Sequence, residues 1–171
     1  MSGMIKVAFA EYLTELLECV CSSVAEYGQG PVCWCGIHPG DNVSWEMCGG
    51  ECGDGVCGMA YVRPMTSFPY QEFPAASLNS QCELPIAHQI EIGILRCMPL
   101  MEDDGTFPDA AVITDAALGI EIDKAALLRG INCCQSSHVK SVEAWQPLGP
   151  GGGCIGGVWR MYVDPINGRR R

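Results

Sequence analysis

Cysteine is the residue type through which this chain could do chemistry. It occurs 12 times in 171 residues, and five of the cysteines share one short segment with seven glycines. These five are Cys33, Cys35, Cys48, Cys52 and Cys57. A segment so rich in glycine buries little apolar surface, so it needs cross-links to hold one conformation. Thiolates here could bind one zinc ion, with His38 as a substitute ligand, or they could form disulfides.

The spacing of the five cysteines leaves both kinds of cross-link open. It is not the usual pair of two-residue knuckles seen in zinc sites. Two disulfides within the segment would leave one cysteine over, and buried free thiols are a third alternative. Each alternative makes the segment a structural element. We therefore expect no cofactor other than a structural zinc ion.

Catalysis by a thiol would need a nucleophile such as Cys57, Cys133 or Cys134, with a lowered pKa and a histidine beside it. No spacing pairs a cysteine with any of the three histidines, His38, His88 and His138. The glycines in residues 151–156 match G-x-G-x-x-G by letter. A dinucleotide site requires a helix after this motif, whereas here a predicted strand follows it. We therefore expect no catalytic residue, no cofactor-binding residue and no enzyme activity.

The adjacent pair Cys133 and Cys134 follows a predicted helix. Neighbouring cysteines seldom bond to each other, because the small ring strains the peptide. We expect one of the two to face the core and the other to reach a distant cysteine, namely Cys82, Cys97 or Cys154.

Charge and composition exclude several classes of function. The net charge is −10, and the only basic run is residues 169–171. Tight binding of nucleic acid needs clustered lysine and arginine, so such a partner is not expected. No apolar run approaches the ~18 residues of a membrane span, and the first residues do not form a signal peptide. The chain is thus expected to be made in a reducing cytosol, where disulfides are rare.

Hydrophobic periodicity predicts two helices. Apolar residues recur at helical spacing over residues 6–27, and this helix ends at Gly28. A second helix runs to about Cys134, with Thr106 able to cap it. Its acidic residues are expected on a solvent-facing side. They are Asp115, Glu121 and Asp123.

The strands that must position the cysteines are shorter. Alternation and turn residues predict strands at residues 32–37, 58–64, 87–98, 139–145 and 155–163. A proline- and aromatic-rich arm covers residues 65–85, and a hairpin loop covers residues 147–153. This order predicts one α+β domain over residues 1–171. It would have an N-terminal helix, an antiparallel or mixed sheet of about five strands, a second long helix packed on one face, and the cysteine-rich insert 33–57.

Four short patterns stand out: residues 144–159 (AWQPLGPGGGCIGGVW), 57–63 (CGMAYVR), 93–99 (GILRCMP) and the pair Cys133 and Cys134. Together they resemble those of neck proteins of long-tailed, non-contractile bacteriophages, most closely the tail terminator (tail completion) proteins. The resemblance covers residues 4–163. It implies an α+β fold with an N-terminal helix, a sheet and a second helix, and a homohexameric ring that stops growth of the tail tube and joins the tail to the filled head.

The resemblance also implies the partners and location of the chain. These would be further copies of itself, the tail tube protein, the head–tail stopper or connector, and genomic DNA that passes through the ring without specific binding. The chain would be made in the host cytoplasm and carried in the virion at the neck. Within the same class, a head–tail stopper or other connector is the alternative. Outside it, a zinc-stabilised binding module is the main rival, ahead of a thiol enzyme.

Overall fold

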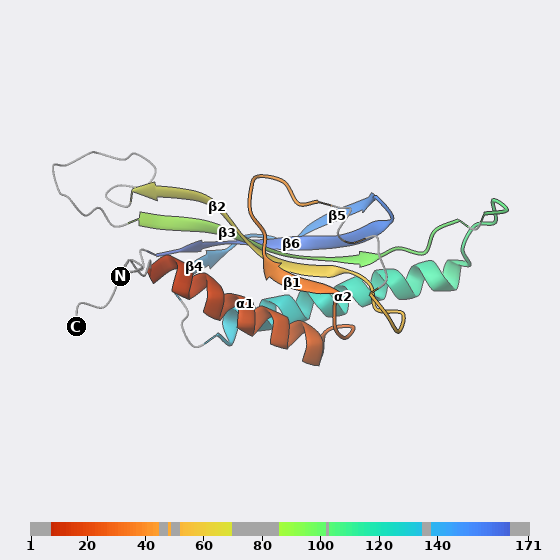
Figure 1. Ribbon diagram of the computed structural model, residues 1–171, viewed down its shortest axis with the longest axis horizontal. Coiled ribbons are helices and arrows are strands. Elements are labelled where there is room, and N and C mark those ends of the chain that lie inside the picture. Colours follow the sequence, from red (N-terminus) through yellow and green to blue (C-terminus); the bar gives the residue numbers. More distant parts are fainter. Residues whose placement is uncertain are drawn as a thin grey trace, which may run out of the picture.

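A mixed sheet with both helices on one of its faces makes up the computed structural model of the chain (Figure 1). The structure describes residues 8–44, 48, 52–69, 86–101, 103–134 and 138–164. The helices and strands run in the order α1 (Ala8–Tyr27), β1 (Trp34–Ile37), β2 (Met59–Pro69), β3 (Ile86–Cys97), α2 (Ala110–Asn132), β4 (Val139–Val142), β5 (Gln146–Gly151) and β6 (Cys154–Val163). The predicted α+β class is confirmed.

The sheet has the strand order β1-β2-β3-β6-β4, and β5 also pairs with β6. Only β1 and β2 are parallel, because the connection between them is the long cysteine-rich insert; the other pairs are antiparallel. β5 pairs with the first half of β6 and β4 with its second half. The long β2–β3–β6 ladder is thus the rigid frame on which the cysteines and charged residues are placed.

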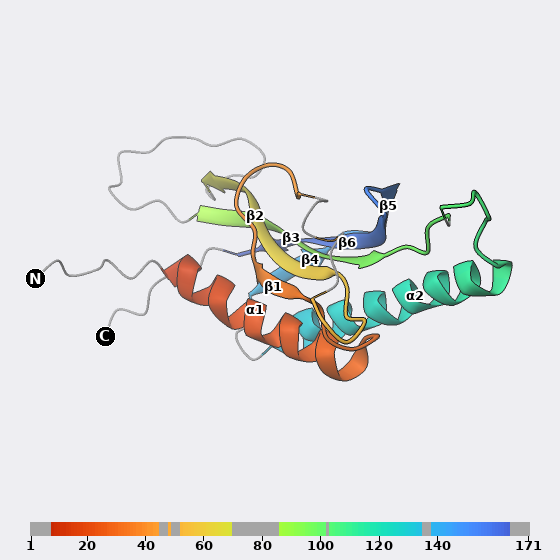
Figure 2. The ribbon, with the colours of Figure 1, turned by 45° about the vertical axis from the view of Figure 1, so that its right-hand side comes forward.

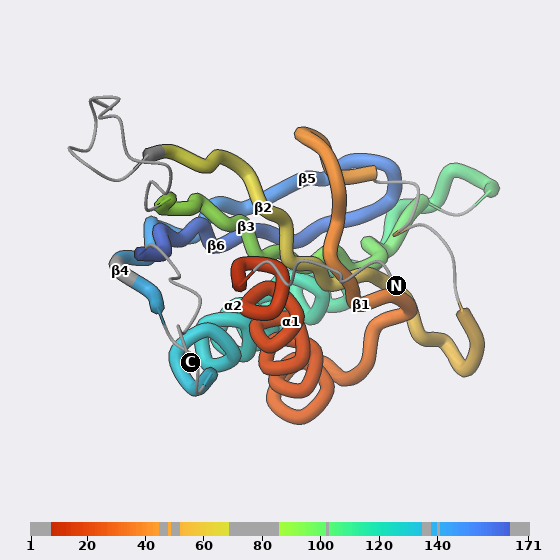
Figure 3. Tube along the Cα trace, turned by 60° about the vertical axis from the view of Figure 1, so that its left-hand side comes forward, coloured from red at the N-terminus to blue at the C-terminus, as the bar shows by residue number. Residues whose placement is uncertain are grey.

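The main core lies between the sheet and the two helices. Ile90, Ile92 and Ile94 alternate along β3 and point to the same face, where they are fully buried. They pack against α1, through residues that include Leu16, and against α2, through residues that include Leu127. Figure 3 shows both helices on this side of the sheet. The amphipathic patterns therefore bury one stripe of each helix against one face of the sheet.

The opposite face of the sheet holds a smaller core that no helix covers. Met59, Tyr61, Leu95 and Val158 are fully buried there, together with two cysteines. The segment that follows β1 crosses over this face and covers part of it (Figure 2). The part of the insert that follows β1 is therefore a lid on the sheet, held by the Cys48–Cys154 cross-link and by apolar residues such as Val43.

A buried carboxylate joins α2 to the sheet and to the end of α1. Asp123 is fully buried, and its Oδ2 accepts from Arg96 Nε of β3 at 2.9 Å. Its Oδ1 accepts from the backbone N of Gln29 at 2.9 Å. The prediction that Asp123 faces solvent is wrong, because the polar side of α2 at this point packs against β3 and not against water.

Three other predictions differ from the structure. β2 continues to Pro69, so residues 65–69 of the predicted arm are strand, paired with the start of β3; residues 70–85 lie outside the described part. The predicted hairpin loop contains β5, which makes six strands where about five were expected. The N-cap of α2 is Asp109 and not Thr106, because Asp109 Oδ1 accepts from the backbone N of Ala111 at 3.1 Å.

Within the described residues, neither helix combines the length and the apolar character needed to cross a membrane.

Candidate functional site

Five disulfides cross-link the described part of the chain. They are Cys19–Cys134, Cys21–Cys35, Cys33–Cys52, Cys48–Cys154 and Cys57–Cys97. Of the five cysteines considered as one zinc site, only Cys33 and Cys52 bond to each other. Cys35, Cys48 and Cys57 each pair with a cysteine outside the segment, from α1, β6 and β3. The five are therefore distributed over four cross-links and do not surround one point.

The candidate substitute ligand His38 packs away from these cross-links among aromatic rings. Its side chain is buried, and its ring meets those of Trp34 and Tyr61 edge-on at centroid distances of 6.2 and 6.1 Å. Its Nε2 accepts from the backbone N of Ser44 at 3.5 Å. These contacts give His38 a packing role beneath the insert.

The adjacent Cys133 and Cys134 do not bond to each other, but the expected division of roles between them is wrong: the cysteine that faces the core is also the one that bonds to a distant cysteine, and the other is exposed. Cys134 is buried and bonds to Cys19 of α1, with a Cα–Cα distance of 5.6 Å. Cys133 is exposed and is the one described cysteine outside a disulfide. The partner is Cys19 because α2 packs along α1. Of the partners that were expected, Cys97 and Cys154 have other bonds, and Cys82 lies outside the described residues.

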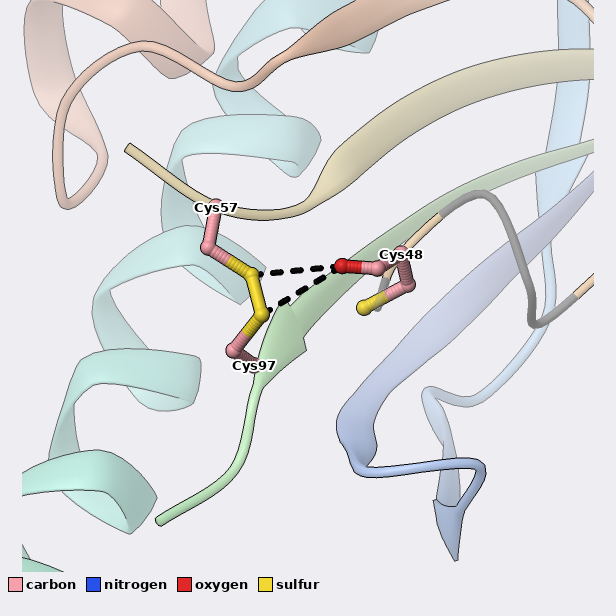
Figure 4. A group of neighbouring side chains, drawn as sticks. All are labelled: Cys48, Cys57 and Cys97. Carbon is pink, nitrogen blue, oxygen red and sulfur yellow. Dashed lines mark hydrogen bonds between the residues drawn. A yellow bond between two sulfur atoms is a disulfide. The ribbon is translucent and has the colours of Figure 1, made fainter. Parts of the chain in front are cut away.

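A cluster of sulfur atoms lies at one end of the β2–β3–β6 ladder. The Sγ atoms of Cys48, Cys57 and Cys97 are all within 4.8 Å of one another, and Cys154 is bonded to Cys48. The backbone O of Cys48 lies 3.2 Å from Cys57 Sγ and 3.3 Å from Cys97 Sγ (Figure 4). Three thiolates at this spacing could hold a metal ion, although all of these cysteines are in disulfides here.

The sheet explains why these cysteines meet. Cys57 lies two residues before the start of β2, Cys97 ends β3 and Cys154 begins β6. Cys97 and Cys154 are direct cross-strand partners. The sequence carried a signal for this cluster, since each of the three cysteines stands at an end of a predicted strand. Reasoning from the dense segment alone missed Cys97 and Cys154.

A charged cluster lies beneath the insert on the face opposite the helices. Glu91 is buried, and its Oε1 accepts from Arg63 Nη2 at 2.7 Å and from Tyr61 OH at 3.3 Å. Its Oε2 accepts from Arg160 Nε at 2.9 Å. Arg63 also donates to the backbone O of Asp41 in the insert. The cluster therefore ties the lid to the sheet.

The chemistry of this cluster is that of a structural network. Burial and the neighbouring charge of Glu91 raise the pKa of Tyr61 above its ordinary value, so the phenol stays protonated. The hollow above the cluster has a volume of about 160 Å³ and is lined by the insert, Tyr61 and the two arginines. Both oxygens of Glu91 are taken by guanidinium groups, which leaves the carboxylate poorly placed to act as a general base.

His88 is held in the sheet by packing. Its Nδ1 lies 2.8 Å from Ser67 Oγ, and its ring stacks on Phe9 at a centroid distance of 3.5 Å. Burial lowers its pKa below the ordinary value of 6.5. These contacts favour a neutral imidazole and do not join it to any described cysteine.

This pKa shift predicts a pH dependence of stability. The unfolded chain binds the His88 proton more readily than the folded chain, so the contribution of His88 is full above pH 6.5 and is lost as the pH falls below it. We expect the free energy of unfolding to fall between pH 7 and 5, and to fall less in His88→Gln. Chemical denaturation at several pH values measures this. A slope in His88→Gln equal to that of the wild type would contradict the assignment.

The second candidate site is an apolar surface around α2. Figure 1 shows the N-terminal half of α2 extending past the end of the sheet. No residue of 110–118 is buried, and Leu118 and Ile122 are 58% and 50% exposed. In the segment before α2, Phe107 is 79% exposed and Leu100 is 65% exposed. We call Leu100, Met101, Phe107, Val112, Leu118 and Ile122 the apolar surface of α2.

A hollow on α2 is continuous with this surface. It has a volume of about 710 Å³, and its lining includes Leu118, Ile122 and Ala125. The guanidinium of Arg129 stacks over the ring of Tyr27 at 4.1 Å and closes one end. An open, mostly apolar hollow of this kind is suited to holding a protein side chain.

No protein-family model matches this chain, and no curated protein matches it. The resemblance to tail terminators therefore stays a prediction.

Proposed function

We propose that the chain is a structural, non-enzymatic virion protein that assembles with copies of itself into a ring, in the manner of a tail terminator at the neck of a long-tailed phage. The observation that supports this most is the apolar surface of α2. Several large apolar side chains are exposed in α2 and in the segment before it, and Leu118 and Ile122 line one hollow; on a chain of net charge −10 such side chains favour a surface that another protein covers.

The start of α2 needs such a partner for its own stability. None of its first nine residues is fully buried and only Ile113 and Ala116 are half-buried, and isolated helical segments of this length are marginal in water. A neighbouring subunit packed on Leu118 and Ile122 would supply the missing tertiary contact. In a ring every subunit shows two different complementary faces, so the apolar surface of one copy meets another face of the next.

The remaining features are consistent with a conduit at the neck. An acidic ring releases few counterions from DNA and would let genomic DNA pass without specific binding. Its partners would be the tail tube protein and the head–tail stopper or connector. A virion leaves the reducing cytosol in which it is made, so the thiols could oxidise to the five disulfides after synthesis.

A zinc-stabilised binding module is the second candidate, and the sulfur cluster of Cys48, Cys57 and Cys97 is the observation that favours it. The two candidates differ in the assembled state. A binding module is expected to stay a monomer that unfolds when its metal is removed, whereas a ring protein oligomerises through α2 with or without metal.

The test is to place charge on the apolar surface of α2. We expect Leu118→Lys with Ile122→Lys to remain monomeric at a concentration at which the wild type forms a closed oligomer. Loss of one central interface side chain costs about 2 kcal/mol, or roughly 30-fold in affinity. Lysine lowers the net negative charge, so greater overall repulsion cannot explain the loss. Sedimentation velocity measures the oligomer.

The control is Ala10→Lys with Thr14→Lys, which adds the same two charges at exposed positions four residues apart on α1. It should assemble as the wild type does, and circular dichroism should show all three proteins folded. Assembly of the doubly substituted protein at wild-type concentrations would exclude α2 as the interface.

A further inference from the structure

We infer that the reduced chain binds one zinc ion through the thiolates of Cys48, Cys57, Cys97 and Cys154. The disulfides Cys48–Cys154 and Cys57–Cys97 are then the oxidised form of the same site. This ligand set shares only Cys48 and Cys57 with the dense cysteine segment. The inference is independent of the ring, because it concerns how the insert is held before oxidation.

The distances between the sulfur atoms fit a metal centre. Zinc bound by four thiolates has Zn–S bonds of about 2.3 Å, which places the sulfurs about 3.8 Å apart in a tetrahedron. Three of the four Sγ atoms already lie within 4.8 Å of one another, and the fourth is bonded to one of them. Cys154 Sγ is outside that group of three, so once the cystines open its side chain has to turn toward Cys57 and Cys97 to complete the tetrahedron.

The backbone holds three of these positions without the disulfides. Cys97 and Cys154 face each other across the β3–β6 ladder. Cys57 continues the β2–β3 register one step beyond Gly58, since Met59 is the partner of Leu95. Side chains on adjacent strands at such positions have Cβ atoms about 4.5–5.5 Å apart. Cys97 lies between the other two because β3 separates β2 from β6, so after reduction the side chains of Cys57 and Cys154 have to converge over Cys97 to share one ion.

Burial makes the site a closed, structural one. Cys48 and Cys154 are fully buried, and Cys57 and Cys97 are half-buried. Met59, Leu95 and Val158 belong to the same apolar cluster, so water has little access as an additional ligand. Structural zinc sites are closed in this way by four protein ligands. In the described residues no other group of three or more potential ligands meets this spacing. The other three cystines therefore have no metal-bound form comparable to this one.

The two forms are linked by a balanced reaction. Binding of Zn²⁺ to four thiols releases four protons, so the affinity rises with pH. Oxidation then takes two electrons from each pair of thiolates, joins their sulfurs and frees the zinc ion. With hydrogen peroxide as the oxidant, each peroxide accepts two electrons and two protons and leaves as two waters. Zinc therefore holds the insert on the sheet in a reducing compartment, and the two cystines hold it afterwards.

The test uses the full chain, reduced with a phosphine and handled without oxygen. We expect about one zinc per chain by elemental analysis, and, with Co²⁺ as the probe, the sulfur-to-metal charge-transfer and visible bands of a tetrahedral tetrathiolate. Peroxide should release the metal as the four thiols of the site are oxidised together with those of the other three cystines. A reduced wild-type chain that binds no metal, or a cobalt spectrum without thiolate bands, would overturn the inference.

Matched variants separate this site from the rest of the cysteines. Cys97→Ser should lose the zinc, because it removes a ligand. Removing only the hydrogen-bond partner of a ligand lowers metal affinity roughly 10–100-fold, and we expect a larger fall here. Cys33→Ser with Cys52→Ser removes another cystine of the same insert and should keep one zinc per chain. The opposite result, with zinc kept by Cys97→Ser and lost from the Cys33 and Cys52 variant, would place the metal elsewhere. The cobalt spectrum of the wild type decides the question even if a variant fails to fold.

Discussion

Replacing Glu91 with glutamine is expected to lower the free energy of unfolding by about 3–5 kcal/mol, the usual cost of breaking a buried ion pair. Glu91 is 3% exposed and accepts from Arg63 and Arg160 through its two oxygens. Its loss leaves the guanidinium of Arg63, which is also buried, without a compensating charge. Urea denaturation followed by tryptophan fluorescence measures the change.

An exposed ion pair on the same chain provides the control. Glu121 pairs with Lys124 on the surface of α2, and Glu121→Gln should cost less than about 1 kcal/mol. Replacing Glu91 and Arg63 together with methionine should recover much of the loss, because a buried pair can be exchanged for apolar side chains at little cost. If Glu91→Gln were as mild as Glu121→Gln, the charged cluster would not hold the insert on the sheet.

The second large effect is expected at the Cys19–Cys134 disulfide, which joins the two helices across 115 residues of sequence. Replacing both cysteines with serine should lower the free energy of unfolding by about 2–5 kcal/mol. The stabilisation by a disulfide grows with the length of the loop that it closes in the unfolded chain, and the other four cross-links shorten that loop. We therefore expect a loss in the lower part of this range while the other four are intact. Thermal unfolding of the oxidised wild type and of this doubly substituted variant measures the difference in stability.

Its neighbour in sequence is a matched control. Cys133 is exposed and outside any disulfide, so Cys133→Ser should leave the melting temperature unchanged. Equal melting temperatures for wild type and the Cys19 and Cys134 variant would show that the helices are held by packing alone.

Local patterns were enough to predict most of the elements. The alternation of Ile90, Ile92 and Ile94 identified β3, and the spacing of Leu13, Leu16, Val20 and Val24 identified α1, because each pattern depends only on which face is buried. The α+β class followed from the order of these elements. These patterns are local in the sequence and do not depend on contacts with distant parts of the chain.

The elements that were missed depend on contacts across the sheet. β5 contains Pro147 and Pro150, which locally indicate a loop. It is a strand because the edge of β6 is available for pairing, and Gln146 and Leu148 pair with residues of β6 there. Residues 65–69 of β2 belong to a segment whose proline and aromatic residues, such as Phe68 and Pro69, predict an arm, and only their pairing with the start of β3 makes them strand. Asp123 was placed toward solvent because nothing near it in sequence reveals Arg96 of β3.

The cysteine pairing could not be read from the sequence. Cys48 and Cys154 are separated by 106 residues, and Cys57 and Cys97 by 40. Spacing within the dense segment suggested partners close by, whereas the sheet brings together cysteines at the ends of different strands. Once the strand order is known, Cys97 and Cys154 follow as neighbours from the register alone.

The central claim is that copies of this chain close into a ring through α2. The most direct measurement is negative-stain electron microscopy of the purified, oxidised protein, with native mass spectrometry of the same sample. We expect rings with a central opening and a mass near six chains of 18.4 kDa, about 110 kDa. Monomers at every concentration, or open filaments without a closed species, would contradict the claim.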